Sequence, residues 1–153
     1  MYNFKEKIVL GIATVAGAGY LKFPGTFGSF VAVLLWAACA ALKITEPFYL
    51  CLILFLIVLG TIVATASEKI LKKVDPGEVV IDEVVGILIT FYSVPFSLKY
   101  AVIGFILFRL YDILKPFPIN VIQKFPKGYG IMLDDILAGF CSFIILKVLC
   151  LII

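Results

Sequence analysis

The feature that most constrains this chain is residues 48–66, an apolar run without a single charged side chain. A helix rises about 1.5 Å per residue, so a run of this length can cross the ~30 Å hydrocarbon core of a bilayer. The whole chain has the same character, because 63% of its 153 residues are hydrophobic and only 15% are charged. That is too little polar surface for a soluble domain. We therefore predict an integral membrane protein with lipid partners.

Further apolar runs flank this segment, and they predict an all-α, multi-pass protein, one compact bundle forming a single domain over residues 1–153. We expect about five membrane segments, at residues 27–42, 48–66, 79–94, 100–114 and 136–153. Residues 79–94 and 100–114 are short for crossing a bilayer, so we expect them to form a tight helical hairpin within the protein. Residues 8–21 are expected to form a retained amphipathic or re-entrant segment, and a cleavable signal peptide is the alternative.

The loops on the two sides of the predicted membrane segments contain different numbers of lysines. One side receives most of them, whereas the other receives only Lys43 and Lys99 from its loops. Because cytoplasmic loops collect Lys and Arg, the crowded side is predicted to be cytoplasmic, with the N-terminus inside and the C-terminus outside. The lysines on that side are Lys5, Lys7, Lys22, Lys69, Lys72, Lys73, Lys115, Lys124 and Lys127.

Two pairs of neighbouring carboxylates stand near the predicted cytoplasmic ends of apolar segments. Each pair precedes a glycine by one helical turn, and a glycine lets another helix approach closely. Acidic groups at membrane depth are costly and commonly functional, although they could instead simply mark the interface and favour a helix N-terminus. The pairs are Asp82-Glu83, followed by Gly86, and Asp134-Asp135, followed by Gly139.

If these four carboxylates meet, they need a cation to offset their repulsion. Oxygen ligands without histidine or thiolate suit magnesium or manganese, and the chain has no histidine. We predict a Mg²⁺ site in which each pair supplies one ligand and one neighbour, which orients water or contacts Arg109 or Lys115. The candidate catalytic residues are Asp82, Glu83, Asp134, Asp135 and, as a fifth carboxylate, Asp112.

Arg109, Asp112 and Lys115 recur at three-residue spacing, so they share one broad face of a helix. Arg109 is the only arginine in the chain, and its planar fork of five donors suits a phosphate group. We predict that Arg109 and Lys115 bind substrate. The alternative is an Arg109–Asp112 pair that neutralises itself within the bundle.

A glycine-containing turn, residues 23–29, opens the first long segment. Thr26 or Ser29 could cap the helix there, and free backbone N–H groups would donate to a phosphate oxygen. We predict that these two residues bind substrate. An ordinary Pro/Gly helix start is an equally good interpretation.

The residues present restrict the chemistry of phosphate transfer. A phosphohistidine is excluded, and the sequence has no Cys-x5-Arg motif, no Asp-x-Asp nucleophile and no Asp-x2-Asp-Gly-x2-Ala-Arg signature of the CDP-alcohol transferases. Metal-assisted hydrolysis, in which a cation neutralises the phosphate and activates water, is the reaction type that the carboxylates favour.

Four motifs, occurring in the same order and together covering residues 19–139, resemble those of the phosphatidylglycerophosphatase A family of membrane lipid phosphatases. The resemblance implies a magnesium-dependent inner-membrane enzyme that converts phosphatidylglycerophosphate to phosphatidylglycerol, with its active site facing the cytoplasm. One departure is Lys127, where the family usually has a glycine. The motifs are Pro24-Gly25-Thr26-x-Gly28-Ser29, Asp82-Glu83-x-x-Gly86, Phe108-Arg109-x-x-Asp112-x-x-Lys115-Pro116-x-Pro118-Ile119 and Gly130-Ile131-Met132-x-Asp134-Asp135-x-x-Ala138-Gly139.

Other classes of protein also place carboxylates at membrane depth. A small transporter or channel subunit would do so, but it would carry charges along a path to both faces, whereas these lie on one side. Another lipid head-group phosphotransferase is a further alternative. A non-catalytic scaffold would need neither the clustered aspartates nor the lone arginine.

Overall fold

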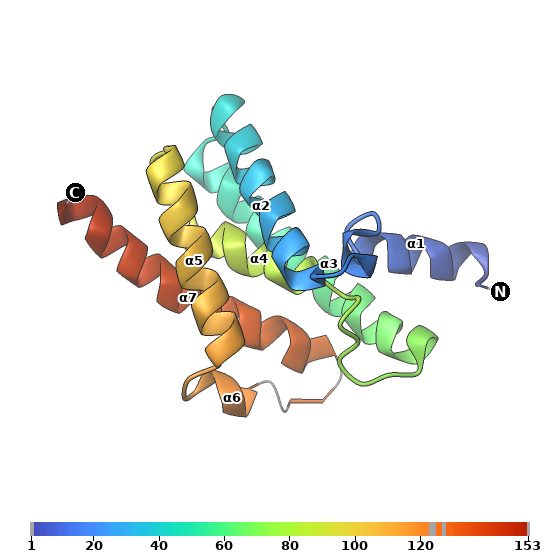
Figure 1. Ribbon diagram of the computed structural model, residues 1–153. Coiled ribbons are helices and arrows are strands. Elements are labelled where there is room, and N and C mark those ends of the chain that lie inside the picture. The colour runs from blue at the N-terminus through green and yellow to red at the C-terminus, as the bar shows by residue number, and fades with distance from the viewer. Residues whose placement is uncertain (1, 123–124, 127, 153) are drawn as a thin grey trace.

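The computed structural model describes residues 2–122, 125–126 and 128–152, and every regular element among them is helical. Lys124 and Lys127, which entered the predictions above, lie outside the described residues. The prediction of an all-α bundle is confirmed (Figure 1). In chain order the helices are α1 Phe4–Ala13, the 3-10 helix η1 Ala18–Tyr20, α2 Pro24–Ala41, α3 Glu46–Leu71, α4 Ile81–Thr90, α5 Leu98–Leu114, α6 Ile119–Ile122 and α7 Gly128–Ile152.

Three helices among the described residues, α2, α3 and α7, are long and apolar enough to cross a membrane. In each of them only 28% of the most apolar stretch is buried inside the protein, which leaves most of its side chains for lipid. The expected count of five membrane segments is therefore wrong. The run at residues 79–94 contains only the 10-residue α4, about 15 Å long, and α5 has 17 residues with three charged side chains among them.

The short helix α4 lies at the centre of the bundle, where it packs against α2, α3, α5 and α7. Most of its side chains are buried, among them Val85, Ile87 and Leu88. Just after α4, the ring of Phe91 stacks on Trp36 of α2 with 4.1 Å between centroids. The prediction of a short hairpin enclosed by the protein is thus correct for α4, because other helices of the protein surround it.

Two glycines bring α4 and α7 into backbone contact. A Cβ added at Gly139 would lie 2.3 Å from the carbonyl oxygen of Gly86, and one added at Gly86 would lie 2.7 Å from the carbonyl oxygen of Asp135. Any larger residue at either position would push the helices apart. The expectation that these glycines allow a close approach is confirmed, and the contact lies one turn from the two carboxylate pairs.

The N-terminal segment forms a short arm rather than one continuous helix. Asn3 caps α1, because its side chain accepts the amide of Glu6 at 2.9 Å and the Glu6 carboxylate accepts the Asn3 amide at 2.7 Å. After Ala13 the chain reverses through three residues with positive φ, at positions 15–17, and enters η1. Figure 1 shows α1 running crosswise to α2 and out to one side of the bundle.

Candidate active site

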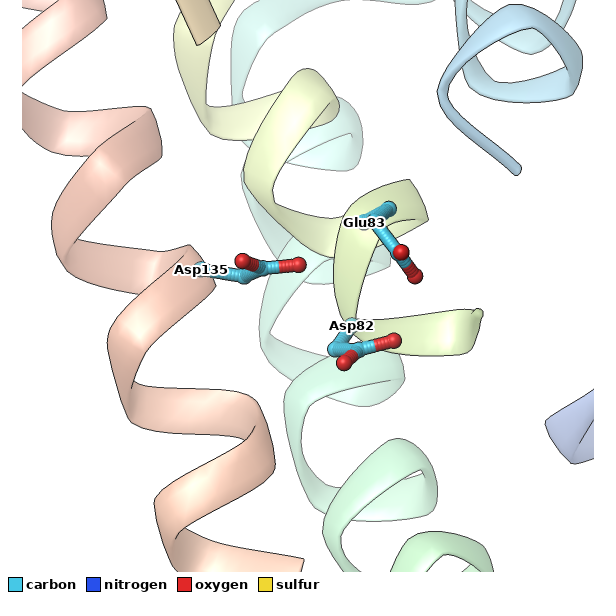
Figure 2. Close-up of side chains that lie close together, drawn as sticks. All are labelled: Asp82, Glu83 and Asp135. Atoms are coloured by element: carbon cyan, nitrogen blue, oxygen red, sulfur yellow. The ribbon is translucent and has the colours of Figure 1, made fainter. Parts of the chain in front are cut away.

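Three carboxylates from two helices converge at one end of α4. Asp82 and Glu83 stand in its first turn, and Asp135 approaches from α7. One oxygen atom from each can be chosen so that all three lie within 4.8 Å of one another. Figure 2 shows Asp135 reaching from α7 toward the first turn of α4, where Asp82 and Glu83 stand. The Gly86–Gly139 crossing is what brings the two chain segments this close.

Two of these carboxylates are buried, Glu83 is half-buried, and the group is incompletely paired. Asp82 is 8% exposed and Asp135 is 3% exposed. Oδ1 of Asp82 and Oε2 of Glu83 have no hydrogen-bond partner in the part of the chain that the structure describes. Burying an unpaired carboxylate is strongly unfavourable, and the positive end of the α4 dipole offsets only ~0.3–1 kcal/mol per charge. The oxygen donors and their orphaned atoms therefore fit a hard divalent cation such as Mg²⁺.

Asp134 lies apart from this cluster although it is next to Asp135 in the sequence. Its carboxylate forms an ion pair with the Lys115 ammonium at the end of α5, and a second oxygen accepts the amide of Asp135 at 3.1 Å. Consecutive helical residues point ~100° apart, and in this pair it is Asp135 that faces α4. In the α7 pair, one carboxylate joins the cluster and its neighbour contacts Lys115. In the α4 pair, both carboxylates belong to the cluster.

Arg109 and Asp112 form an ion pair within α5, between Nη1 and Oδ2. Both side chains are mostly buried. The pair is not isolated, because the charges of both residues act on Glu83 and that of Asp112 also acts on Asp135. Arg109 thus lies at the edge of the cluster with donors beyond the one that Asp112 uses.

The start of α2 reaches the same place through Gly25. A Cβ added at Gly25 would lie 2.5 Å from Oε1 of Glu83 and 2.8 Å from Nη1 of Arg109. Gly25 was not among the predicted site residues, although a glycine in the first turn of a helix was a visible signal. Its missing side chain is what lets Glu83 and Arg109 approach the N-terminus of α2.

The two hydroxyl residues predicted at this helix start have different surroundings. Ser29 is fully buried, and its hydroxyl donates to the carbonyl of Gly25 at 2.7 Å within the helix. Thr26 is exposed in the first turn of α2. Of the residues predicted to bind substrate, Arg109 is therefore the one in contact range of the carboxylate cluster, and Lys115 is held one step away by Asp134.

Comparison with known proteins identifies a family. A family model described as phosphatidylglycerophosphatase A matches residues 11–150, which include every residue of the cluster. No solved structure matches the chain.

Three curated relatives match most of the chain. A protein of Bacteroides thetaiotaomicron, provisionally named a phosphatidylinositol-3-phosphatase, is 37% identical over 146 residues, 90% of each chain. The phosphatidylglycerophosphatase A of Haemophilus influenzae is 34% identical over 88% of this chain and 83% of its own. That of Escherichia coli is 34% identical over 78% of this chain and 69% of its own. Since the family model and these relatives cover the chain almost from end to end, the protein belongs to the phosphatidylglycerophosphatase A family of membrane phosphatases.

Proposed function

We propose that this membrane phosphatase hydrolyses phosphatidylglycerophosphate to phosphatidylglycerol and inorganic phosphate, using Mg²⁺ at the cytoplasmic face of the inner membrane. The observation that supports the proposal most strongly is the cluster of Asp82, Glu83 and Asp135, buried with two oxygen atoms unpartnered among the described residues. A structural cluster would be expected to pair its charges, whereas a metal site leaves ligand atoms free.

In this proposal Asp82, Glu83 and Asp135 hold the cation. When bound, Mg²⁺ would neutralise the phosphate and lower the pKa of a coordinated water. Asp134 holds Lys115 beside the site, one step from the cluster, and Asp112 holds Arg109 at its edge, through the ion pairs already described. Both aspartates thus act by positioning a basic side chain and do not bind the metal.

Arg109 is the residue proposed to grip the phosphate. Its guanidinium can keep one bond to Asp112 and still present a second pair of donors, a geometry that suits two phosphate oxygens. The N-terminus of α2 adds backbone N–H groups and a positive dipole on the same side, reached through Gly25. Thr26, exposed in that turn, remains a proposed contact for the head group. The Ser29 hydroxyl instead binds the Gly25 carbonyl and would support the turn.

The lysines on described residues favour a cytoplasmic site. Those near the carboxylate end outnumber those near the other end of α4. The α4–α5 hairpin returns the chain to the carboxylate end, so three full spans are compatible with the proposed orientation. The acyl chains would stay in the bilayer against the exposed apolar faces while the head group enters between the helix ends. The lysines at the carboxylate end are Lys5, Lys7, Lys22, Lys69, Lys72, Lys73 and Lys115.

A second candidate substrate is phosphatidylinositol 3-phosphate, favoured by the name of the Bacteroides relative. Both lipids carry a phosphate monoester on a polyol, so the same site chemistry applies to either. The test is phosphate release from each lipid by purified protein in nanodiscs with Mg²⁺, with Asp82→Asn as the matched control. We expect phosphatidylglycerophosphate to be hydrolysed faster. Preference for the inositol lipid would replace the proposed substrate, and no Asp82-dependent release from either would refute the proposed reaction.

A further inference from the structure

The arm formed by residues 2–23 carries an apolar strip that nothing in the described protein covers. Leu10 and Ala13 face inward from α1 and are buried, and α1 packs on α3. On the opposite side Phe4 is 78% exposed and Ile8 is 47% exposed. At ~100° per residue, positions 4 and 8 lie only about 40° apart, so Phe4 and Ile8 form one strip along the helix.

Positive charge borders this strip on both sides. Lys5 and Lys7 stand about 60–100° either side of it, by the same helical geometry, and both are exposed. The one acid in α1, Glu6, is half-buried and bonded to the amide of Asn3, so it does not face the strip. An apolar strip between lysines is the pattern of a helix that lies in the interface of an anionic membrane.

Exposed apolar side chains continue from this arm onto the lipid-facing side of the bundle. Aromatic side chains are exposed in and after η1, where Tyr20 and Phe23 precede the first turn of α2, and Lys22 lies with its ammonium 5.6 Å from the centroid of the Phe23 ring. Exposed apolar residues then follow along α2 itself, at Phe27, Phe30 and Leu34. Tyrosines, other aromatic residues and lysines are the side chains expected at the boundary between head groups and acyl chains.

We propose that the arm binds the surface of the leaflet that faces the carboxylate cluster, with Phe4 and Ile8 among the upper acyl chains and Lys5, Lys7 and Lys22 on anionic head groups. The occupant of the strip is thus lipid, and the preferred lipid is anionic. Neither statement depends on the proposed substrate.

The arm is also attached to the chain segment that leads into the site. The amide of Val80 donates to the carbonyl of Ala13 at 2.9 Å, two residues before Asp82. Gly19 packs so closely on the loop before α4 that an added Cβ would lie 1.9 Å from the carbonyl oxygen of Glu78. Seating of the arm on the leaflet therefore fixes the position of the first turn of α4 relative to the membrane.

The test measures depth with an environment-sensitive fluorophore on single cysteines, in a background where the four native cysteines are replaced by alanine. Labels at Phe4→Cys and Ile8→Cys are compared with one at Val74→Cys, a matched control because Val74 is also apolar and is 89% exposed in the loop between α3 and α4. The protein is reconstituted in nanodiscs of phosphatidylcholine alone or mixed with phosphatidylglycerol. Quenching is measured with a lipid-attached nitroxide and with aqueous iodide.

We expect the labels at positions 4 and 8 to be quenched by the lipid nitroxide and protected from iodide, with the reverse at position 74. Anionic discs should increase the nitroxide quenching at position 8, and the double variant Lys5→Gln/Lys7→Gln should abolish that increase. Iodide quenching at positions 4 and 8 as strong as at 74 would overturn the proposal. Protection from both quenchers would also overturn it, because the strip would then be covered by protein. Equal seating in neutral and anionic discs would refute the preference for anionic lipid.

Discussion

The two ends of the central helix α4 treat charged groups in opposite ways. Beyond its C-terminal end, the Lys147 ammonium donates to the carbonyl of Ser93 at 2.7 Å, and the Ser93 hydroxyl donates to Oε1 of Glu46 at 2.6 Å. At its N-terminal end, Asp82 and Glu83 each have a buried oxygen without a partner among the described residues. One end satisfies its polar groups within the protein, and the other leaves them open.

This chain can therefore pair its charges where only structure is required. The loop between α3 and α4 is another paired case, because Lys73 donates to Glu78 at 2.7 Å and this hydrogen bond lowers the pKa of that carboxyl below its ordinary value. Unpaired buried carboxylates oppose folding, so their retention at one end indicates a task other than stability. Binding a cation is the task that their oxygen donors fit.

We expect the largest effect from neutralising one carboxylate at the N-terminal end of α4, which we call the open end. Asp82→Asn and Asp135→Asn keep the shape of the side chain while removing one negative charge from a repelling group. We expect turnover to fall about a hundredfold or more, as for loss of a metal ligand, while the metal-free protein is equally stable or more stable. Phosphate release and thermal unfolding measured on the same preparations test both halves of the expectation.

Glu46→Gln is the matched control at the paired end, where an amide oxygen can still accept from Ser93. It should leave turnover near that of the unchanged protein. If Asp82→Asn and Asp135→Asn lost activity only in proportion to lost folded material, the two ends of α4 would not differ in kind and the comparison would fail.

The next effect concerns Arg109, the residue proposed to bind phosphate at the edge of the open end. Arg109→Lys keeps the positive charge but removes the planar fork, so one or two charge-assisted hydrogen bonds to phosphate are lost. At ~1.5–3 kcal/mol per bond, the loss of one bond should lower turnover roughly ten- to a hundredfold, and the loss of a second bond should lower it further. A titration with Mg²⁺ checks the assignment, since the defect should persist at saturating metal. Full rescue by excess Mg²⁺ would instead place Arg109 in support of the metal site.

A smaller effect on turnover is expected from filling the space that Gly25 leaves at the N-terminus of α2. Gly25→Ala adds a methyl group that would lie 2.5 Å from Oε1 of Glu83, so Glu83 and Arg109 must shift. Alanine in a helix is otherwise favoured over glycine by ~0.5–1 kcal/mol. We therefore expect lower turnover without loss of thermal stability. A destabilised protein with unchanged turnover per folded molecule would show that Gly25 serves packing alone.

The smallest effect on activity belongs to the paired end. Lys147→Met removes the donor to Ser93, and we expect ~1 kcal/mol of destabilisation with unchanged turnover. Lys115→Met at the open end is the matched lysine substitution, and it should lower turnover because Asp134 and the phosphate both lose a cation. Chemical denaturation and phosphate release on the two variants give the comparison. Equal losses of turnover would remove the distinction between the ends.

Much of the fold and of the site was predictable because it depends on short spacings along the chain. The turn between Asp82 and Gly86, repeated at Asp135 and Gly139, indicated a close helix crossing with carboxylates beside it. The count of spans was not predictable, because an apolar run such as residues 79–94 has the same composition whether lipid or protein surrounds it. The partners of Ser29 and Asp134 depend on the rotation of each helix about its axis, which sequence spacing alone does not fix. Gly25 was missed because its role is the space it leaves.

The metal dependence of phosphate release from phosphatidylglycerophosphate, measured on the purified protein in nanodiscs, shows directly whether the buried carboxylates hold a cation. The cluster of Asp82, Glu83 and Asp135 predicts that activity disappears in excess EDTA and returns when Mg²⁺ is added back beyond the chelator. Asp135→Asn should recover far less under the same addition. Full activity of the unchanged protein in excess EDTA would contradict the claim that these buried carboxylates work by holding a cation.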